Sequence, residues 1–397
     1  MSAQAGGKLS APAAYLRGFD RLGVVLAACA AAGFICLPFV VFKSNRIVPG
    51  DPRGVLEVLP MWAALSCYVV LSCDAAVALR IRGARVRLVA ALIGLGVVLL
   101  ALAVACNALT PQGNKVVRIA PGAGFWVLLI ALGLMATDAI TRMHLRPRTR
   151  VLSLVVFLAV AGLAFCHGWF DNVSIMREYA VNAERFSREA QRHIWLALGS
   201  LTAAVIVALP IGIFCHRVPR LRSVILGTLN VIQTVPSIAL FGILMVPLGA
   251  LAAAMPLAAD LGISGIGAAP AVVALFLYSL LPIVANTATG LQRVSPAAVE
   301  AARGMGMTSW QILISVELIL ALPVILTGIR IVLVQNIGLV TIAALIGGGG
   351  LGVFVFQGIG QTATDLVLLG AIPTVGLAFS AAVLLDALVE VMDRGRR

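Results

Sequence analysis

The sequence predicts an all-α integral membrane protein with about ten transmembrane helices. Of its 397 residues, 61% are hydrophobic and only 11% are charged, which lies outside the range of soluble globular domains. Apolar runs of about 20 residues span a bilayer, and this chain has many such runs without a charged face. The net charge of +13 therefore indicates basic loops beside a membrane rather than nucleic-acid binding.

Ten apolar runs mark the expected membrane spans. They are Leu22–Phe42, Val58–Leu79, Leu88–Ala108, Gly122–Thr141, Val151–Trp169, Ile194–Cys215, Ser223–Pro247, Gly267–Leu291, Ser309–Ile337 and Leu366–Val389. Asp74 and Asp138 interrupt the first five runs, and Asp138 has Arg142 one turn later, so we expect that pair to interact. Whether the two acids regulate anything stays open. Arg330, within the ninth run, is expected to extend towards the outer face.

Basic residues gather in the loops on one side of these spans. They are Lys8, Arg17, Arg21, Arg80, Arg82, Arg85, Arg87, Arg142, Arg146, Arg148, Arg150, Arg217, Arg220, Arg222, Arg394, Arg396 and Arg397. The opposite loops hold fewer. These are Lys43, Arg46, Arg53, Lys115 and Arg118. The positive-inside rule therefore predicts that both chain termini, and the loop between the eighth and ninth spans, are cytoplasmic.

A polar stretch at residues 171–192 separates the fifth and sixth spans. Its apolar residues recur at helical spacing, which predicts an amphipathic helix. They are Ile175, Tyr179, Ala183, Phe186 and Ala190. We expect this helix to lie on the outer membrane surface or against the bundle, with Arg185 and Glu189 paired on its wet face. The chain should then turn into the sixth span at His193.

The loop between the eighth and ninth spans is a short polar interlude in apolar sequence. Ser295 and Pro296 suit the start of a helix, because serine can cap it and proline is tolerated at its first position. Gly304 and Gly306 weaken the helix and let the chain bend before the next apolar run. A compact helix with little side-chain bulk suits insertion into a groove of another protein.

This loop resembles the EAA loop of ABC-importer permeases, because Glu300-Ala301-Ala302 is followed by Gly306. The resemblance implies a cytoplasmic coupling helix that docks on an ATPase subunit. Its residues would be Pro296, Glu300, Ala301, Ala302, Gly304 and Gly306. The family pattern continues with Leu-Pro, whereas this chain has Leu318-Ile319, so the helix geometry after the loop stays open. The alternative is a chance match in an ordinary loop, and the charge sidedness argues against it.

The second half of the chain resembles the five-span importer-permease domain throughout. QNIGLVTIAALIGGGGLG and GAIPTVGLAF resemble the quaternary-amine branch, whose members take up glycine betaine, choline or carnitine. Residues 1–170 resemble an extra block of about five spans that some betaine-uptake members carry. The division we predict is 1–170 for this block, 171–192 for an external amphipathic helix, and 193–397 for a type I importer permease core.

The resemblance implies a permease subunit of an ATP-driven importer for a small osmolyte, in a bacterial inner membrane. Its partners would be a cytoplasmic ATPase, a second permease chain (identical or homologous) and an external solute-binding protein. The sequence has no P-loop and no cluster of histidines with carboxylates, so we expect no catalytic, metal or cofactor site in this chain, and ATP and Mg²⁺ on the ATPase. Alternatives are an ion-coupled secondary transporter built from two five-span halves, or an ABC permease for an amino acid.

Polar residues beside prolines mark a candidate translocation path, because broken helices are tolerated only beside a cavity or other protein. These residues are Gln233, Thr234, Pro236 and Ser237 in the seventh span, Tyr278 and Asn286 in the eighth, and Gln335 and Asn336 in the ninth. Hydrogen bonding between helices, without solute contact, is the alternative. A candidate gate follows at Gly347, Gly348, Gly349 and Gly350, with close backbone packing as its alternative.

Overall fold

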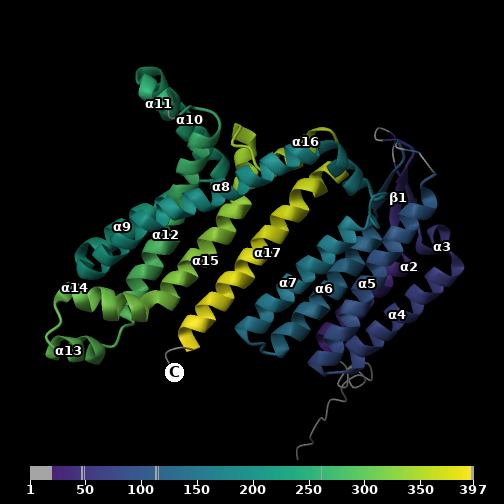
Figure 1. The fold of residues 1–397 in the computed structure, drawn as a ribbon, viewed down its shortest axis with the longest axis horizontal. Helices are drawn as coiled ribbons and strands as arrows, with labels where there is room; N and C mark the ends of the chain where they lie inside the picture. The colour runs from purple at the N-terminus through teal and green to yellow at the C-terminus, as the bar shows by residue number, and fades with distance from the viewer. Residues whose placement is uncertain are drawn as a thin grey trace, which may run out of the picture. The chain divides into compact units, whose positions relative to one another are not determined.

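The structure is a computed structural model that describes residues 20–45, 48, 50–111, 114, 116–260 and 262–394. Within these ranges, nine helices are long and apolar enough to cross a membrane, and one shorter apolar helix precedes them. The chain divides into two compact units (Figure 1). Unit 1 comprises residues 1–146 and 159–177, and unit 2 comprises residues 147–158 and 178–397. The predicted cytoplasmic location of the chain termini concerns residues outside the described ranges.

Unit 1 is a helical bundle. Its helices are α2 (Arg21–Ile35), α3 (Val55–Val58), α4 (Met61–Arg80), α5 (Ala84–Leu109), α6 (Ala123–Arg142) and the second half of α7 (Pro147–Cys166). Helix α2 packs against α4 and α6, and α5 packs against the same two helices. Their contact surfaces bury Leu71, Val98 and Leu128 in the main apolar core of the unit.

A small antiparallel sheet lies at one end of unit 1, which the sequence did not predict. Its strands are β1 (Val40–Lys43), β2 (Asp51–Arg53) and β3 (Arg118–Pro121), in the order β2-β1-β3. The predicted span Leu22–Phe42 is therefore wrong at its end. Helix α2 stops at Ile35, shortly before Pro38, and the β-branched and aromatic residues that follow favour a strand.

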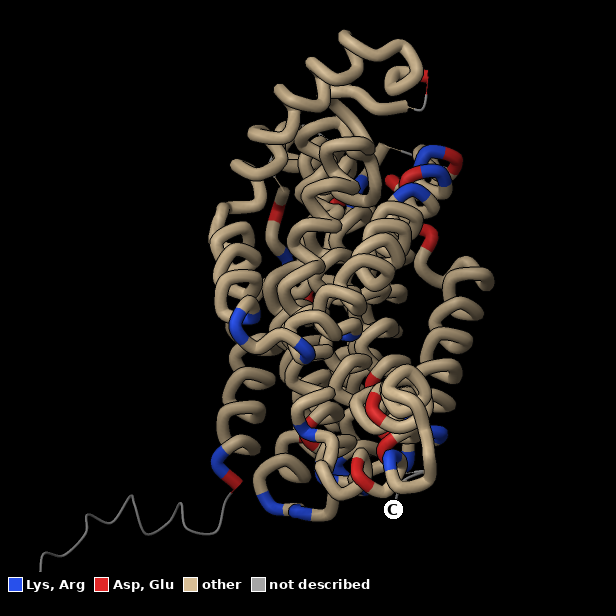
Figure 2. Tube along the Cα trace, turned by 90° about the vertical axis from the view of Figure 1, so that its left-hand side faces the viewer, with Lys and Arg blue, Asp and Glu red and all other residues tan. Residues whose placement is uncertain are grey.

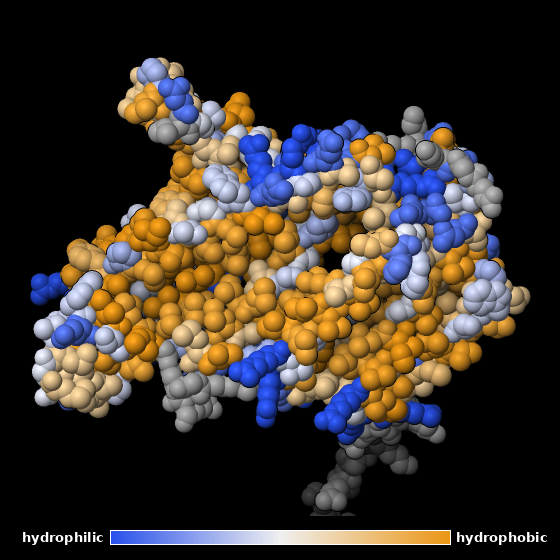
Figure 3. Space-filling view, in the orientation of Figure 1, coloured by the Kyte–Doolittle hydropathy of each residue, from blue (hydrophilic) through white to orange (hydrophobic). Residues whose placement is uncertain are grey.

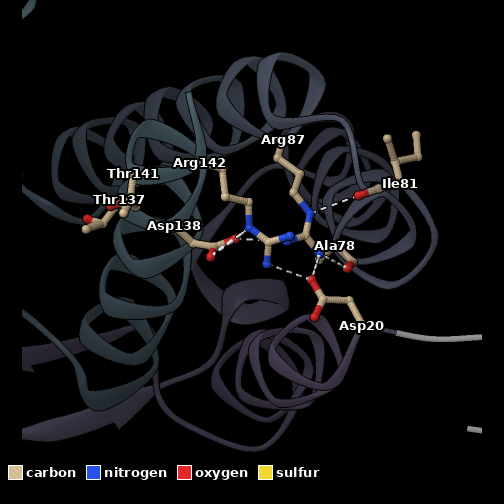
Figure 4. A network of polar contacts seen from close by, with 8 residues as sticks. All are labelled: Asp20, Ala78, Ile81, Arg87, Thr137, Asp138, Thr141 and Arg142. Atoms are coloured by element: carbon tan, nitrogen blue, oxygen red, sulfur yellow. Dashed lines mark hydrogen bonds and ion pairs between the residues drawn. The ribbon is translucent and has the colours of Figure 1, made fainter. Parts of the chain in front are cut away.

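Four charged side chains form a closed ring in unit 1 (Figure 4). Arg87 of α5 binds Asp20 at 2.5 Å and Asp138 at 2.9 Å, and Arg142 binds the same two carboxylates at 3.2 Å and 2.9 Å. The predicted pairing of Asp138 with Arg142 is thus confirmed. Because the charges alternate in sign and sum to zero, the ring can join α2, α5 and α6 in apolar surroundings.

Arg87 is also bonded to the end of α4. Its guanidinium donates to the carbonyl oxygens of Ala78 at 2.6 Å and Ile81 at 2.9 Å, and only 1% of the side chain is exposed. Carbonyls at a helix C-terminus lack helical donors and attract a cation. Arg87 therefore satisfies the end of α4 and the two aspartates together.

Asp74 of α4 differs from Asp138, although the sequence places both near the end of an apolar run. Its side chain is buried, and within the described residues its Oδ2 has no hydrogen-bond partner. Gly94 of α5 leaves room for it, since a Cβ there would lie 2.1 Å from Oδ2. Asp74 and Asp138 therefore do not share one role.

Unit 2 is built around α12. Its elements are the first half of α7, most of α8 (Ser174–Arg217), α9 (Pro219–Thr234), α10 (Ser237–Ala254), α11 (Pro256–Asp260), α12 (Ala268–Gln292), α13 (Pro296–Gly304), α14 (Ser309–Ile312), a π-helical turn (Leu313–Glu317), α15 (Leu318–Ala343), a 3-10 turn (Ala344–Ile346), α16 (Gly352–Gly360) and α17 (Thr364–Arg394). Helix α12 packs against α9, α10 and α15, and α15 packs against α17. The core includes the fully buried Ala204, Ile283 and Val332.

Two predicted boundaries in unit 2 are wrong. The amphipathic stretch continues into the sixth span without a turn at His193, and α8 is instead kinked within the stretch at Asn182, where the backbone is not helical (φ −112°, ψ 15°). The predicted seventh span, Ser223–Pro247, is instead two helices separated at Val235 and Pro236. Proline lacks an N–H and disfavours helical geometry in the preceding residue, so the break falls at the Val235-Pro236 step.

The surfaces of the long helices are mostly apolar. Charged residues lie mainly near helix ends in the trace of Figure 2, and apolar side chains cover the middle of the helices in the view of Figure 3. Helix α7 shows this most clearly, with Phe157, Val160 and Leu163 exposed. Exposed apolar surface of this extent suits contact with lipid.

We predict that Arg87→Met destabilises the chain by about 1–3 kcal/mol, because it leaves Asp20 and Asp138 with only the exposed Arg142 and removes the donor of two carbonyls at the end of α4. Arg85→Met, which removes an exposed arginine from the same helix, should change little. Thermal unfolding of the purified chain in detergent measures both. Equal melting temperatures for the two variants would contradict the proposed role of the ring.

Candidate functional site

The coupling-helix candidate is a short, separate helix. Helix α13 begins after Ser295 with Pro296 at its first position, as the sequence predicts, although the Ser295 side chain makes no capping hydrogen bond. Glu300 and Ala301 are exposed, whereas Ala302 is buried to 1% exposure. The helix therefore buries one small side chain against the unit and leaves the side chain of Glu300 exposed.

Gly306 forms the turn that ends α13. Its φ is +84°, in the left-handed region that glycine adopts without cost. The Met307 N–H donates to the Ala302 carbonyl at 3.2 Å, and the Gly306 N–H donates to the Arg303 carbonyl at 3.0 Å. These two bonds define a Schellman motif, which explains why this position needs glycine.

The chain then re-enters the unit without a proline kink. Thr308 and Gln311 form a capping box at the start of α14, with the Thr308 N–H donating to Gln311 Oε1 at 2.8 Å. The π-helical turn follows and continues into α15 through Leu318-Ile319. A π-helical turn therefore stands just before the position where the family pattern has Leu-Pro.

The proline break at Val235-Pro236 and the proline inside α12 are linked by hydrogen bonds between their helices. The Tyr278 hydroxyl donates to the carbonyl of Val235, at the break between α9 and α10, at 2.5 Å. Pro282 lacks the N–H that would bond the Tyr278 carbonyl in a regular helix, and Gln233 Nε2 donates to that carbonyl at 3.3 Å. Gln233 and Tyr278 are thus brought together. Near them, Thr234 and Pro236 are exposed and Ser237 is half-buried.

Asn336 joins three helices inside unit 2. It is fully buried, and its Nδ2 donates at 3.0 Å to both Ser200 of α8 and Ser279 of α12. Its neighbour Gln335 is half-buried. The contacts of Asn336 match the interhelical alternative considered above, and its lining of a path stays a prediction.

Asn286 lies apart from these residues, at a cavity of about 470 Å³ in unit 2. The cavity is lined by Arg150, Asn286, Thr289, Arg293, Pro323, Val324, Thr327, Asp386, Val389, Glu390 and Asp393. Ion pairs stand in or beside it, since Arg150 binds Glu390 and Arg330 binds Asp386. The predicted extension of Arg330 towards the outer face is therefore wrong, because α17 supplies its partner.

The glycine run is an ordered turn at the end of α15. Gly347, Gly349 and Gly350 have φ between +79° and +86°, so other residues would be strained there. Gly348 is buried, and its N–H donates to the Ala343 carbonyl at 2.9 Å. A gate at this run stays a prediction, and the close-packing alternative describes its contacts.

Helix α8 fixes this run in place. Glu189 accepts the Gly350 N–H at 2.6 Å, and His193 Nδ1 accepts the Leu351 N–H at 3.2 Å. His193 Nε2 donates to the Ile337 carbonyl at 3.0 Å, and the ring is fully buried. The predicted interfacial turn at His193 is replaced by a buried contact between α8, α15 and the glycine run.

Arg185 also points towards the rest of unit 2 and does not pair with Glu189. It donates to Gln357 of α16 at 2.9 Å and stacks over Phe354 at 5.5 Å. Phe186 contacts the same ring, with centroids 6.0 Å apart. The predicted Arg185–Glu189 pair is therefore wrong, whereas Phe186 of the apolar stripe does pack against the unit.

Two family models match the chain. Residues 20–176 match the N-terminal domain of ABC transporter permease YehY, and residues 208–397 match the inner membrane component of binding-protein-dependent transport systems. The class of protein is thus a multi-pass membrane permease.

Curated relatives align with about half of this chain and most of their own length. The osmoprotectant import permease protein OsmW of Salmonella typhimurium is 44% identical, over 51% of this chain and 88% of its own. Choline transport system permease protein OpuBD of Bacillus subtilis is 37% identical, over 55% and 90%. Carnitine transport permease protein OpuCB of Listeria monocytogenes is 36% identical, over 52% and 87%. An inward-facing structure of the MetNI methionine ABC transporter aligns at 20% identity over 52% of this chain and 95% of that chain, with a TM-score of 0.44.

The chain belongs to the permeases of binding-protein-dependent ABC importers, as the EAA-like loop indicated. The hypothesis of an ion-coupled secondary transporter made of two similar halves is wrong, because the two halves match different family models. The hypothesis of an amino-acid permease is not supported by the names of the curated relatives given above.

We predict that Tyr278→Phe lowers the melting temperature, because an unpaired carbonyl at Val235 costs about 1–3 kcal/mol. Tyr179→Phe, at an exposed tyrosine of α8, is the matched control and should change little.

Gln233→Ala and Tyr278→Ala should lower solute uptake at matched membrane abundance. Normal uptake by both alanine variants would contradict their place in the path.

Proposed function

We propose that this chain is the membrane subunit of an ATP-driven importer that brings a quaternary-amine osmolyte, such as glycine betaine, choline or carnitine, into a bacterial cell. The solute class comes from the relatives, whose names include osmoprotectant, choline and carnitine transport. Selectivity for a quaternary ammonium group would come from an aromatic cage on the external solute-binding protein.

The observation that carries the proposal is the geometry of α13. Helix α13 has an exposed acid at Glu300, a buried small residue at Ala302 and a glycine turn at Gly306. A short helix with these features can bind in a groove of another protein. We assign Glu300 and the exposed Met305, at 76% exposure, to the surface that meets the ATPase. Met305 supplies apolar contact area, and Glu300 supplies charge specificity.

In this proposal, ATP binding and hydrolysis belong to the ATPase subunit, and solute movement belongs to this chain. The chain has no P-loop, so ATP and Mg²⁺ bind to the ATPase subunit. Two permease chains and two ATPase subunits form the transporter. ATP binding closes the ATPase pair and shifts the permease between inward-open and outward-open states, because each state makes different contacts. Both termini and α13 are cytoplasmic in this proposal, in agreement with the basic loops.

We predict that Glu300→Arg lowers the amount of ATPase that co-purifies with the chain by at least about tenfold, since like-charge contacts at an interface cost several kcal/mol. Gly306→Ala should weaken docking as well, because an L-residue at positive φ costs about 1–2 kcal/mol. Gly96→Ala is the matched control. It lies within α5 of unit 1, outside the docking helix, with open space around it, so alanine should be tolerated or stabilising.

Quantitative co-purification from membranes with equal chain abundance measures all three variants. Equal ATPase recovery with Glu300→Arg and with the unchanged chain would contradict the assignment of α13. A purified chain that transports solute without any ATPase would contradict the proposed function as a whole.

A further inference from the structure

Glu317 is a buried carboxylate in the turn that follows the α13–α14 segment. It ends the π-helical turn, and only 4% of the residue is exposed. A charge in apolar surroundings needs a partner, and the structure supplies one 100 residues earlier. Arg217 Nη2 donates to Glu317 Oε2 at 2.6 Å. Arg217 is the last residue of α8, where carbonyl dipoles also favour a cation.

The two partners are not equally buried. The Glu317 side chain is 6% exposed, whereas the Arg217 side chain is 43% exposed. Glu317→Gln would therefore leave only a hydrated cation, and its amide keeps the shape of the carboxylate. Loss of the arginine would instead strand a buried charge, which is the costlier change. Glutamine at this position is thus the variant that removes the interaction with the least damage to folding.

Apolar contacts pack the same turn against three helices. Leu313, at the start of the π-helical turn, packs in a buried cluster with Leu291 of α12 and Ile325 of α15. Leu209 and Ile213 of α8 pack against that cluster. The π-helical turn is therefore fixed to α8 both by an ion pair and by apolar packing.

The π-helical turn also contacts α13. Helix α13 contacts both α14 and the π-helical turn, and it buries Ala302 against the unit. Helix α13, the π-helical turn and α8 thus form a short, continuous set of contacts. The turn is also where the long helix from Ser309 to Ile346 leaves regular α geometry, and π-helical turns are common places for helices to bend.

We propose that Glu317, acting through Arg217, is a positioning residue that transmits movement of α13 to α8, and that this ion pair couples ATP hydrolysis to solute movement. The inference rests on the proposed function. Docking depends on the surface of α13, whereas coupling depends on the Glu317–Arg217 pair behind it. The two can therefore be separated by mutation.

The test uses the complete transporter, with its ATPase and binding protein, reconstituted in lipid vesicles with glycine betaine, choline or carnitine as the probe. Glu317→Gln should retain its ATPase on purification, while solute imported per ATP hydrolysed falls about tenfold. Arg217→Lys, which keeps the charge, should retain most of the coupling. Glu184→Gln, at an exposed carboxyl of α8, is the matched control and should leave the ratio unchanged.

Normal import per ATP by Glu317→Gln would overturn the inference. Equal losses of ATPase recovery and of import would also overturn it, because the residue would then act in docking or folding. If Glu317→Gln does not accumulate, the exchanged pair Glu317→Arg with Arg217→Glu is measured, and its import per ATP decides in the same way. Failure of the unchanged chain to retain an ATPase would contradict the proposed function instead.

Discussion

The polar side chains that join the helices of this chain take their partners from the chain itself, because lipid offers no hydrogen bonds to replace those of water, and Asp74 is an exception. The proline break at Val235 is tolerated because the Tyr278 hydroxyl meets the freed carbonyl. Pro282 has no N–H to bond the Tyr278 carbonyl, and Gln233 donates to that carbonyl instead. These two hydrogen bonds connect α9 and α10 with α12. Gln233 and Tyr278, two residues of the candidate path, therefore stabilise the backbone around Pro236 and Pro282.

The two units meet this requirement in different ways. Unit 1 gathers its charges into a closed ring around Arg87, where two arginines and two aspartates cancel. Burial alone would raise the pKa of Asp20, but the hydrogen bond and charge of Arg87, together with Arg142, hold it below its ordinary value. The contribution of Asp20 to stability is therefore complete above about pH 4 and is lost as the pH falls through the lowered pKa. Unit 2 instead distributes single pairs, such as Arg217 with Glu317, along its helices.

The sequence predicts the class, the long apolar helices and the short helix at Pro296–Gly304 well, because these depend on local composition and on a motif. Gly306 could be assigned to a turn from its residue type alone, and the structure gives that turn its hydrogen bonds. The π-helical turn and the sheet could not be predicted, since both depend on tertiary packing. Glu317 is a lone acid in an apolar run, which indicates a residue that needs a partner. That partner, Arg217, could not be predicted because it lies 100 residues away. Arg330 was misjudged for the same reason, because its partner is on α17.

The central claim is that this chain moves solute only when a separate ATPase hydrolyses ATP. The most direct measurement is uptake of radiolabelled glycine betaine, choline or carnitine into vesicles that contain the chain, its ATPase and its binding protein, with ATP or an ion gradient as the sole energy source. We expect uptake with ATP and none with a proton or sodium gradient alone. Uptake driven by an ion gradient in vesicles that lack the ATPase would contradict it.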